Sequence, residues 1–223
     1  MSREVRVLTA LAGVYPYVPK VLAFCDDPSV IGCDFFVMER LDGIILRKNL
    51  PRGMSLSREE TAQLCRNVVD RLIDPHSIHY KSAGLADLGK PEGYVRRQIE
   101  GWSRRYRDAR TPNAPSYDRV MLWLDEKMPP EVGASVIHGD YRFDNVILDP
   151  RNPMQIIGVL DWELTTIGDP LMDLGNTLAY WVEANDPAPV QLIRRQPSNA
   201  PGMRTRREFV DYYAERAGIE IAG

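Results

Sequence analysis

Polar residues gather densely between two apolar runs in the segment VIHGDYRFDNVILD, residues 136–149. Eight consecutive positions hold one His, two Asp, one Arg and one Asn, among them His138, Asp140, Arg142 and Asn145. A tight turn needs only one or two residues of this kind. Because these groups stand at what reads as the mouth of a buried hairpin, their number predicts a site of chemistry.

A second acidic segment, Asp161-Trp162-Glu163, follows the apolar run IIGVL. If the strand in NVILD pairs with the strand in IIGVL, then Asp140, Asn145 and Asp161 meet at one end of the pair. Amide and carboxylate oxygens are hard ligands that suit Mg²⁺, which keeps several waters and shares the phosphates of a nucleotide. An Asp that the metal does not need can orient a hydroxyl and accept its proton. These groups are the minimal equipment for phosphoryl transfer.

The composition argues against several classes of protein. The 223 residues are 44% hydrophobic and 26% charged, which is ordinary for a soluble globular chain. A formal net charge of -3 gives no electrostatic reason to expect nucleic acid, and no apolar run approaches the roughly 18 residues of a membrane span. Three cysteines without metal or disulfide spacing favour a reducing compartment. Since the first residues lack a signal-peptide pattern, we expect a cytoplasmic protein.

The N-terminal quarter of the chain predicts one helix and two strands. Apolar positions in residues 3–12 recur with a helical period. Residues 18–27 and 33–41 are typical of strands, and the turn signal Asp27-Pro28 joins them. Residues 42–56 read as a linker that leads into the helices that follow.

The rest of the sequence is mostly helical, with a small β insertion that carries the polar segment. Ser57 and Glu60 match a capping box for a helix that runs to about Leu72, and Thr205 with Glu208 starts the last helix, which ends near Gly218. This order predicts an α+β protein with two unequal lobes. The other expected elements are helices in residues 91–110, 115–128 and 169–184, short strands from residue 135, and a surface loop in residues 185–202.

Large apolar residues of the helical part are predicted to belong mainly to the core. They occur at helical spacings, which favour core packing over a ligand cage. The alternative, that some of them line a substrate cleft, stays open. The candidates are Tyr94, Ile99, Trp102, Tyr106, Trp123 and Trp181.

Four segments, REVRVLTAL, DPSVIGCDFFVMERLDG, HGDYRFDNVILD and GVLDWELTTIGDPLMDLG, together resemble one known family. They look like the kinase-like small-molecule phosphotransferases, the aminoglycoside phosphotransferase and choline kinase group. The likeness is strongest to bacterial proteins related to the kinase domain that is fused to acyl-CoA dehydrogenases in animals. It covers nearly the whole chain, in the family's order. The resemblance implies a protein-kinase-like, two-lobed α+β fold with an incomplete small lobe and a mostly helical large lobe.

The resemblance also implies roles for the polar residues. Asp140 would be the catalytic base for the substrate hydroxyl, and Asn145 and Asp161 would be the ligands of Mg²⁺. His138 would support the loop through hydrogen bonds. Arg142 would serve either phosphate or the structure of the loop, and both readings stay open. Two residues of the following helix, Asp169 and Asp173, would brace the loop.

The nucleotide-binding residues are implied in the same way. The segment FFVMERLDG would be the last strand of the small lobe and the hinge. There the backbone of Glu39 and Leu41 would bond the adenine of ATP beside Met38. Glu4 would be the helix glutamate that pairs with a phosphate-binding lysine.

That lysine and the glycine-rich turn of the family have no candidate in this sequence, because no Lys precedes Lys20. The sequence therefore looks like a family member truncated at both ends. Residues 1–41 would be a remnant of the nucleotide-binding lobe and hinge, and residues 42–223 the catalytic and substrate lobe, incomplete at its C-terminus. We expect weak or absent ATP turnover from this chain by itself.

The leading hypothesis is an ATP- and Mg²⁺-dependent phosphotransferase acting on a small-molecule hydroxyl, either a hydroxyacyl-CoA or an aminoglycoside-like compound. No nucleic acid or membrane partner is expected. The alternative is a truncated, non-catalytic module that binds a nucleotide or a partner. The missing lysine favours this alternative, and the complete set of Asp140, Asn145 and Asp161 opposes it. A protein kinase is a weaker option, because no peptide-binding activation loop is visible after Asp161.

Overall fold

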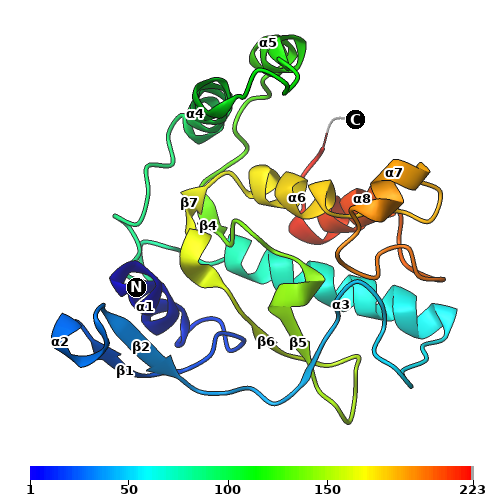
Figure 1. Ribbon diagram of the computed structural model, residues 1–223. Helices are drawn as coiled ribbons and strands as arrows, with labels where there is room; N and C mark the ends of the chain where they lie inside the picture. Colours follow the sequence, from blue (N-terminus) through cyan, green and yellow to red (C-terminus); the bar gives the residue numbers. More distant parts are fainter. Residues whose placement is uncertain (222–223) are drawn as a thin grey trace.

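The computed structural model describes residues 1–221, which form helices and short strands in an α+β arrangement (Figure 1). The elements of the first half are α1 (Ser2–Leu11), β1 (Val21–Cys25), α2 (Pro28–Ile31), β2 (Phe35–Met38), β3 (Ile44–Ile45), α3 (Arg58–His76), α4 (Tyr94–Ala109) and α5 (Asp118–Glu126). Those of the second half are β4 (Ser135–Ile137), the 3₁₀ turn η1 (Phe143–Asn145), β5 (Val146–Leu148), β6 (Ile156–Val159), the 3₁₀ turn η2 (Trp162–Leu164), β7 (Thr166–Gly168), α6 (Pro170–Ala179), α7 (Ala188–Leu192) and α8 (Arg206–Ala217).

The N-terminal elements largely confirm the sequence prediction. Helix α1 buries Val7, Leu8 and Leu11 on one face, and strands β1 and β2 pair antiparallel. The predicted turn between the strands is instead the short helix α2. It forms because the carboxylate of Asp27 caps it by accepting a hydrogen bond from the backbone N–H of Ser29 at 2.8 Å.

The segment expected as a linker, residues 42–56, contains a strand. Strand β3 pairs with β5, with Ile44 opposite Leu148, and completes a three-stranded sheet in the order β3-β5-β6. Gly43 permits this approach, because a Cβ at its position would lie 2.6 Å from the carbonyl oxygen of Leu148. A strand of two residues has too little alternation to be recognised from the sequence.

The prediction of a hairpin around the polar segment is wrong. Strand β4 does not pair with β5 but with β7, where Ser135 lies opposite Gly168, whereas β5 pairs with β6. The polar segment therefore crosses from one sheet to another. The 3₁₀ turn η1 lies in this crossing and does not join two paired strands, so its polar residues do not form a hairpin turn.

Both capping boxes predicted from the sequence are present, and the helices α3 and α8 begin where they were expected. Helix α8 also ends as predicted, at Gly218. Helix α3 continues beyond Leu72 to His76, although Pro75 lies in its last turn and lacks an N–H. The carbonyl oxygen of Arg71, which would have accepted that bond, accepts one from the hydroxyl of Tyr15 instead, at 3.1 Å.

Two predictions about the helical part need correction. Trp102 and Trp123 are not core residues, since they are 63% and 58% exposed, whereas Trp181 is buried as expected. Helices α4 and α5, which carry the two exposed tryptophans, project from the body of the molecule in Figure 1. The expected surface loop in residues 185–202 contains α7 and the buried side chain of Gln196, which donates to the carbonyl of Tyr180.

One apolar core joins the N-terminal helix to the rest of the molecule. It includes Leu8 of α1, Val68 of α3, Val146 of β5, Trp162 of η2 and Phe209 of α8. Because these residues come from both ends of the chain, the polar segment is held by packing from several directions. No helix within residues 1–221 is long and apolar enough to cross a membrane.

Candidate active site

Strands β5 and β6 bring the two polar segments together, as their sequences predicted. Val146 lies opposite Val159, and the N–H of Leu160 donates to the carbonyl of Asn145 at 2.8 Å. Asn145 and Asp161 therefore flank the same end of the strand pair. Asp140 is tied to this end because the side-chain amide of Asn145 donates to the Asp140 carbonyl at 2.8 Å.

The carboxylate of Asp140 is half-buried and paired with Arg142, whose Nη2 lies 2.9 Å from its Oδ2. Burial raises the pKa of Asp140, and the negative charge of Asp161 acts in the same direction. The positive charge of Arg142 and the proximity of His138 oppose this shift. A carboxylate with a raised pKa is a stronger base, which suits proton abstraction from a hydroxyl.

Arg142 is engaged by groups of the protein itself. Besides its bond to Asp140, its Nε lies 3.4 Å from Asp144, and its guanidinium stacks on the ring of Tyr180 at 4.8 Å from the centroid. The side chain is only 15% exposed. Of the two roles open for Arg142, these contacts favour that of holding the loop.

His138 supports the loop from inside the core. Its Nε2 lies 2.8 Å from the carbonyl of Leu160, and its Nδ1 accepts from the N–H of Asp140 at 3.2 Å. Complete burial lowers the pKa of His138. The ring is therefore neutral, with its proton on Nε2, and it joins the Asp140 segment to the strand that ends at Asp161.

Asp173 of α6 fixes the backbone of the same loop. Its carboxylate accepts hydrogen bonds from the N–H groups of His138 and Gly139, both at 2.8 Å, and lies 3.1 Å from His76 Nε2. Burial alone would raise the pKa of Asp173. The hydrogen bond and charge interaction with His76, together with the hydrogen bond from the N–H of Gly139, outweigh burial and lower that pKa. The bracing role expected of Asp173 thus matches the geometry.

Asp169 lies elsewhere than expected. Its carboxylate caps α6 through the N–H of Leu171 at 2.8 Å and accepts from the N–H of Val132 at 2.7 Å, so it holds the approach to β4. The loop is instead held by Asn176, which donates to the carbonyl of Gly139 at 2.6 Å. Sequence reasoning missed Asn176 and His76, since only the fold brings these residues to the loop.

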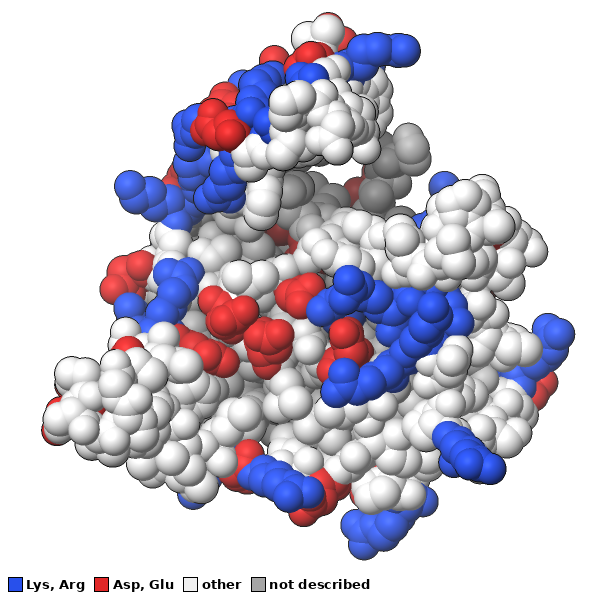
Figure 2. Space-filling view, viewed as in Figure 1, with Lys and Arg blue, Asp and Glu red and all other residues white. Residues whose placement is uncertain are grey.

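Acidic side chains from two distant parts of the chain meet beside this loop. Burial raises the pKa of Glu4 on α1, and the charges of Asp161 and Glu163 add to the effect. The segment is anchored to α1 because Arg3 donates to the carbonyl of Thr165 at 2.8 Å. Figure 2 shows acidic side chains gathered in the hollow of this face, next to a group of Lys and Arg.

Asp161 has an unusual backbone. Its φ of 68° lies in the left-handed region, and among residues 1–221 Tyr117 is the other non-glycine residue with a positive φ. Such a conformation costs on the order of 1 kcal/mol or more and concentrates at functional sites. In the part of the chain that the structure describes, no hydrogen bond or ion pair neutralises the Asp161 carboxylate.

The donor set fits Mg²⁺ better than a transition metal. Nowhere in residues 1–221 do three His, Cys, Asp or Glu side chains gather as a metal cage. Asn145 uses its amide N–H on the Asp140 carbonyl, which leaves its side-chain oxygen for a ligand. One amide oxygen and one carboxylate, in a locally acidic hollow, are typical of a magnesium ion that shares its other positions with water and phosphate.

The segment predicted as the hinge has polar backbone groups to offer. The N–H of Glu39 donates to the carbonyl of Lys20 at 2.8 Å, and the N–H of Lys20 donates to the Glu39 carboxylate at 2.7 Å. In residues 1–221, neither the Glu39 carbonyl nor the Leu41 N–H takes part in a backbone hydrogen bond. Met38, just before them, is 41% exposed.

Curated relatives match almost the whole chain. It is 35% identical over 220 residues to acyl-CoA dehydrogenase family member 10 of Mus musculus, and 34% identical over 221 residues to acyl-CoA dehydrogenase family member 11 of Homo sapiens. Each match covers 98% of this chain but only 20% and 28% of the relative. The chain therefore spans between a fifth and just over a quarter of the length of these relatives.

Solved structures match the fold. A Ralstonia eutropha protein assigned as an aminoglycoside phosphotransferase superposes with a TM-score of 0.83 at 37% identity, over 99% of this chain and 66% of that chain. An aminoglycoside phosphotransferase from Streptomyces rimosus, in complex with ADP and streptomycin, gives a TM-score of 0.64 at 16% identity, over 99% and 76% of the two chains. The second likeness shows the fold alone.

A family model confirms the resemblance seen in the sequence. The model of the phosphotransferase enzyme family matches residues 1–209. Together with the structural matches, this confirms the predicted kinase-like α+β fold. The chain belongs to the phosphotransferase enzyme family and has the protein-kinase-like fold of its small-molecule kinases.

Proposed function

We propose that this chain moves the γ-phosphate of ATP, bound with Mg²⁺, to the hydroxyl of a small molecule. The observation that carries this proposal is the convergence of Asp140, Asn145 and Asp161 at one end of the β5–β6 pair. The Streptomyces rimosus enzyme of the same fold binds ADP together with streptomycin, which supports a nucleotide and a hydroxyl compound as the two ligands.

Each residue of the site has a distinct task in this reaction. The raised pKa of Asp140 equips it to orient the acceptor hydroxyl and take its proton. Asn145 and Asp161 would hold the metal, which supplies charge neutralisation for the phosphates. Arg142 keeps the Asp140 carboxylate in place through the 2.9 Å bond. His138 and Asp173 fix the loop backbone, so that little reorganisation is needed at the moment of transfer.

The nucleotide would lie along the N-terminal part of the molecule. The Glu39 carbonyl and the Leu41 N–H offer one acceptor and one donor to the adenine edge, beside Met38. Glu4 on α1 lies near enough to Asp161 and Glu163 for their charges to raise its pKa, and it would face the phosphates through a cation. In this proposal residues 1–41 form the nucleotide side of the site, and residues 42–223 form the catalytic and acceptor side.

The acceptor belongs to the proposal as well. The likeness to acyl-CoA dehydrogenase family members 10 and 11 supports a hydroxyacyl-CoA, and the likeness to aminoglycoside phosphotransferases supports a hydroxyl of an aminoglycoside-like compound. Both are alcohols, so the chemistry at Asp140 is the same for either.

A test of the proposal needs no known acceptor, because water can slowly take the place of the hydroxyl. Release of inorganic phosphate from ATP and Mg²⁺ is measured at high protein concentration for the wild-type chain, Asp140→Asn and Asp144→Asn. We expect Asp140→Asn to lose roughly 10²–10⁴-fold in rate. Asp144→Asn, which removes the other carboxylate beside Arg142, retains most of the rate. If the wild type releases phosphate above the uncatalysed rate, an equal rate for Asp140→Asn contradicts the role of Asp140.

A non-catalytic binding module is the second candidate function. It is favoured by one observation: among the described residues, no Lys or Arg forms an ion pair with Glu4. This candidate predicts that ATP and Mg²⁺ bind without any release of phosphate above the uncatalysed rate. The phosphate-release experiment, combined with a binding measurement, distinguishes the two candidates.

A further inference from the structure

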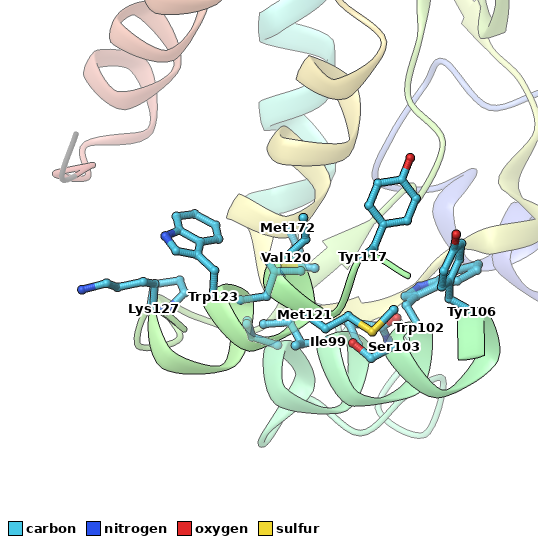
Figure 3. Close-up of a pocket in the computed structure, with 14 residues that line it drawn as sticks. Ile99, Trp102, Ser103, Tyr106, Tyr117, Val120, Met121, Trp123, Lys127 and Met172 are labelled. Atoms are coloured by element: carbon cyan, nitrogen blue, oxygen red, sulfur yellow. The ribbon is translucent and has the colours of Figure 1, made fainter. Parts of the chain in front are cut away.

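We propose that the acceptor of this phosphotransferase carries an apolar, uncharged body that binds between helices α4, α5 and α6. This inference rests on the proposed function and names the class of its acceptor. The observation behind it is a pocket of about 870 Å³ between α4 and α5, closed on one side by Met172 of α6 (Figure 3). Its volume lies in the range of pockets that hold small molecules.

The lining of this pocket is almost entirely apolar. Its walls are formed by aromatic and aliphatic side chains such as Ile99, Trp102, Tyr106 and Trp123, and no carboxylate lines it. Lys127 is its one ionisable cation, and in Figure 3 its amine points away from the group of aromatic side chains. A polycationic sugar would therefore lose its hydration here without gaining an ion pair.

The exposure of these side chains argues for a ligand. Trp102, Tyr117 and Trp123 are 63%, 52% and 58% exposed, although large aromatic residues gain free energy when they leave water. Scattered apolar residues on a surface need no explanation, but a contiguous apolar patch marks a binding site. Here the patch lines a concave pocket, so its natural occupant is a small apolar body.

A second cavity lies between the apolar pocket and the catalytic loop. It has a volume of about 330 Å³, and Gly139, Asp173 and Asn176 lie in its wall. It shares Gln98, Trp102 and Met172 with the apolar pocket, so the two cavities lie side by side. An elongated molecule that occupies both cavities would place its hydroxyl beside Gly139, the residue before Asp140, while its apolar body lies between α4 and α5.

The charges around this space agree with that assignment. The carboxylate in the wall of the second cavity is that of Asp173, and it is already bound by His138, Gly139 and His76. Helix α4 carries five Arg against one Glu and one Asp. The positive charge of α4 thus disfavours a cationic group in the apolar pocket.

The affinity of primary alcohols of increasing length tests the proposal directly. Binding of 1-butanol, 1-hexanol and 1-octanol is followed by tryptophan fluorescence, since Trp102 and Trp123 line the pocket. We expect each added methylene to tighten binding about three- to fourfold, the factor for a methylene that leaves water. Kanamycin, a cationic hydroxyl compound, should neither bind at the pocket nor compete with 1-octanol.

Two variants test whether the alcohols bind in the apolar pocket. Ile99→Asp adds a carboxylate to the lining, and we expect it to weaken 1-octanol at least tenfold. Trp102→Ala removes an exposed side chain, so it should fold normally and weaken 1-octanol by a similar factor. The matched control is Leu192→Asp, which adds the same charge at a 78% exposed leucine of α7 outside both cavities, and it should bind 1-octanol like the wild type.

Several results would overturn the proposal. They are an affinity that does not depend on chain length, a kanamycin affinity equal to that of 1-octanol, and octanol binding unchanged in both pocket variants. A further contradicting result would come from sedimentation velocity. If the wild type is a dimer and Trp123→Glu is a monomer, a second copy of the chain covers the apolar pocket. Because the alcohols are titrated without ATP, a failure here leaves the phosphate-release test of the proposed function untouched.

Discussion

At the scale of single residues, the candidate site works through side chains that restrain one another. Asp140 is held by Arg142, and Arg142 is held in turn by Asp144 and the ring of Tyr180. This chain of contacts leaves the carboxylate of Asp140 half-buried, with its pKa raised by burial and kept in check by Arg142. The ionisation of the proposed base therefore depends on its neighbour.

Arg142→Ala should shift the acidic limb of the pH–rate profile. The positive charge of Arg142 lowers the pKa of Asp140, so removing it raises that pKa further. The base is then protonated up to a higher pH, and kcat/KM begins to fall at a higher pH than in the wild type. Arg142→Lys retains the charge and should restore part of the shift.

The measurement for this prediction is the rate of phosphate release from ATP between pH 4 and pH 8 for the three proteins, with circular dichroism as the check on folding. A limb that stays in place, or that moves to lower pH, would show that Arg142 does not control the ionisation of the reacting carboxylate.

The polar residues of the loop could be predicted from the sequence, but most of their partners could not. The residue types and spacing of Asp140, Asn145 and Asp161 suffice to predict a metal and a base near one another. His76 and Asn176 carry no motif, and they reach the loop only because α3 and α6 pack beside it. That information lies in tertiary packing, which a local pattern does not contain.

At the scale of elements, the site depends on the pair of strands β5 and β6. Strand β5 lies between β3 and β6, and the end of the β5–β6 pair sets the positions of Asn145 and Asp161. The sequence predicted β5 and β6 because both are apolar runs next to polar residues. It predicted neither β3 nor the pairing of β4 with β7, since strands of two or three residues show almost no periodicity.

Gly43→Ala should destabilise the protein by loosening β3 from β5. The new methyl carbon would lie 2.3 Å from a side-chain atom of Ile147 and 2.6 Å from the carbonyl oxygen of Leu148, so the strands must move apart. We expect a loss of about 1–3 kcal/mol in the free energy of unfolding, as for other overpacked sites. Urea unfolding measures this loss.

The matched control for that change is Gly101→Ala. Gly101 lies within helix α4, and a Cβ there meets no heavy atom within 4 Å. Since alanine favours a helix over glycine, this variant should be neutral or more stable by about 0.5–1 kcal/mol. If both variants lose the same stability, the close approach of β3 to β5 does not constrain the fold.

Helices α4 and α5 show what hydrophobic periodicity cannot predict about a helix. Their periodic apolar residues correctly predict helices, but the same periodicity predicts core positions for two tryptophans that are exposed. Periodicity shows that a helix has an apolar face, but it does not show whether protein, ligand or solvent covers that face.

At the scale of the whole molecule, one buried carboxylate ties distant elements to the catalytic loop. Asp173 of α6 binds His76 of α3 and the loop N–H groups of His138 and Gly139. His76 in turn lies 2.7 Å from the hydroxyl of Tyr213 of α8. Four parts of the chain therefore depend on a single side chain.

Asp173→Asn should lower the free energy of unfolding by roughly 3 kcal/mol at neutral pH, the scale for breaking a buried charged network. The pKa of Asp173 is lowered in the folded state. Its contribution is therefore fully present above the ordinary Asp pKa of about 3.9 and is lost as the pH falls through the lower folded value.

Urea unfolding of the wild type and Asp173→Asn between pH 2.5 and pH 7 measures this contribution, with Asp108→Asn on the surface of α4 as the control. The stability gap should be constant near neutrality and shrink in acid. A gap that is absent at pH 7, or that widens in acid, contradicts the central place given to Asp173.

The fold class and family could be predicted from the sequence because four separate motifs occur in a fixed order. The division at residue 41 stays a prediction. For the apolar residues of α4 and α5 the sequence left two readings open, core packing and a substrate cleft, because the pocket between these helices and Met172 depends on helix packing rather than on any motif.

Calorimetric titration of this chain with ATP in the presence and absence of Mg²⁺ tests the proposed site most directly. Asp161→Asn removes the proposed metal ligand, and Glu163→Gln removes the neighbouring negative charge as a matched control. The site as described predicts binding that requires Mg²⁺, weakens at least tenfold in Asp161→Asn, and persists in Glu163→Gln. Binding of the same strength in the wild type and Asp161→Asn would contradict a magnesium–nucleotide site at the end of β5 and β6.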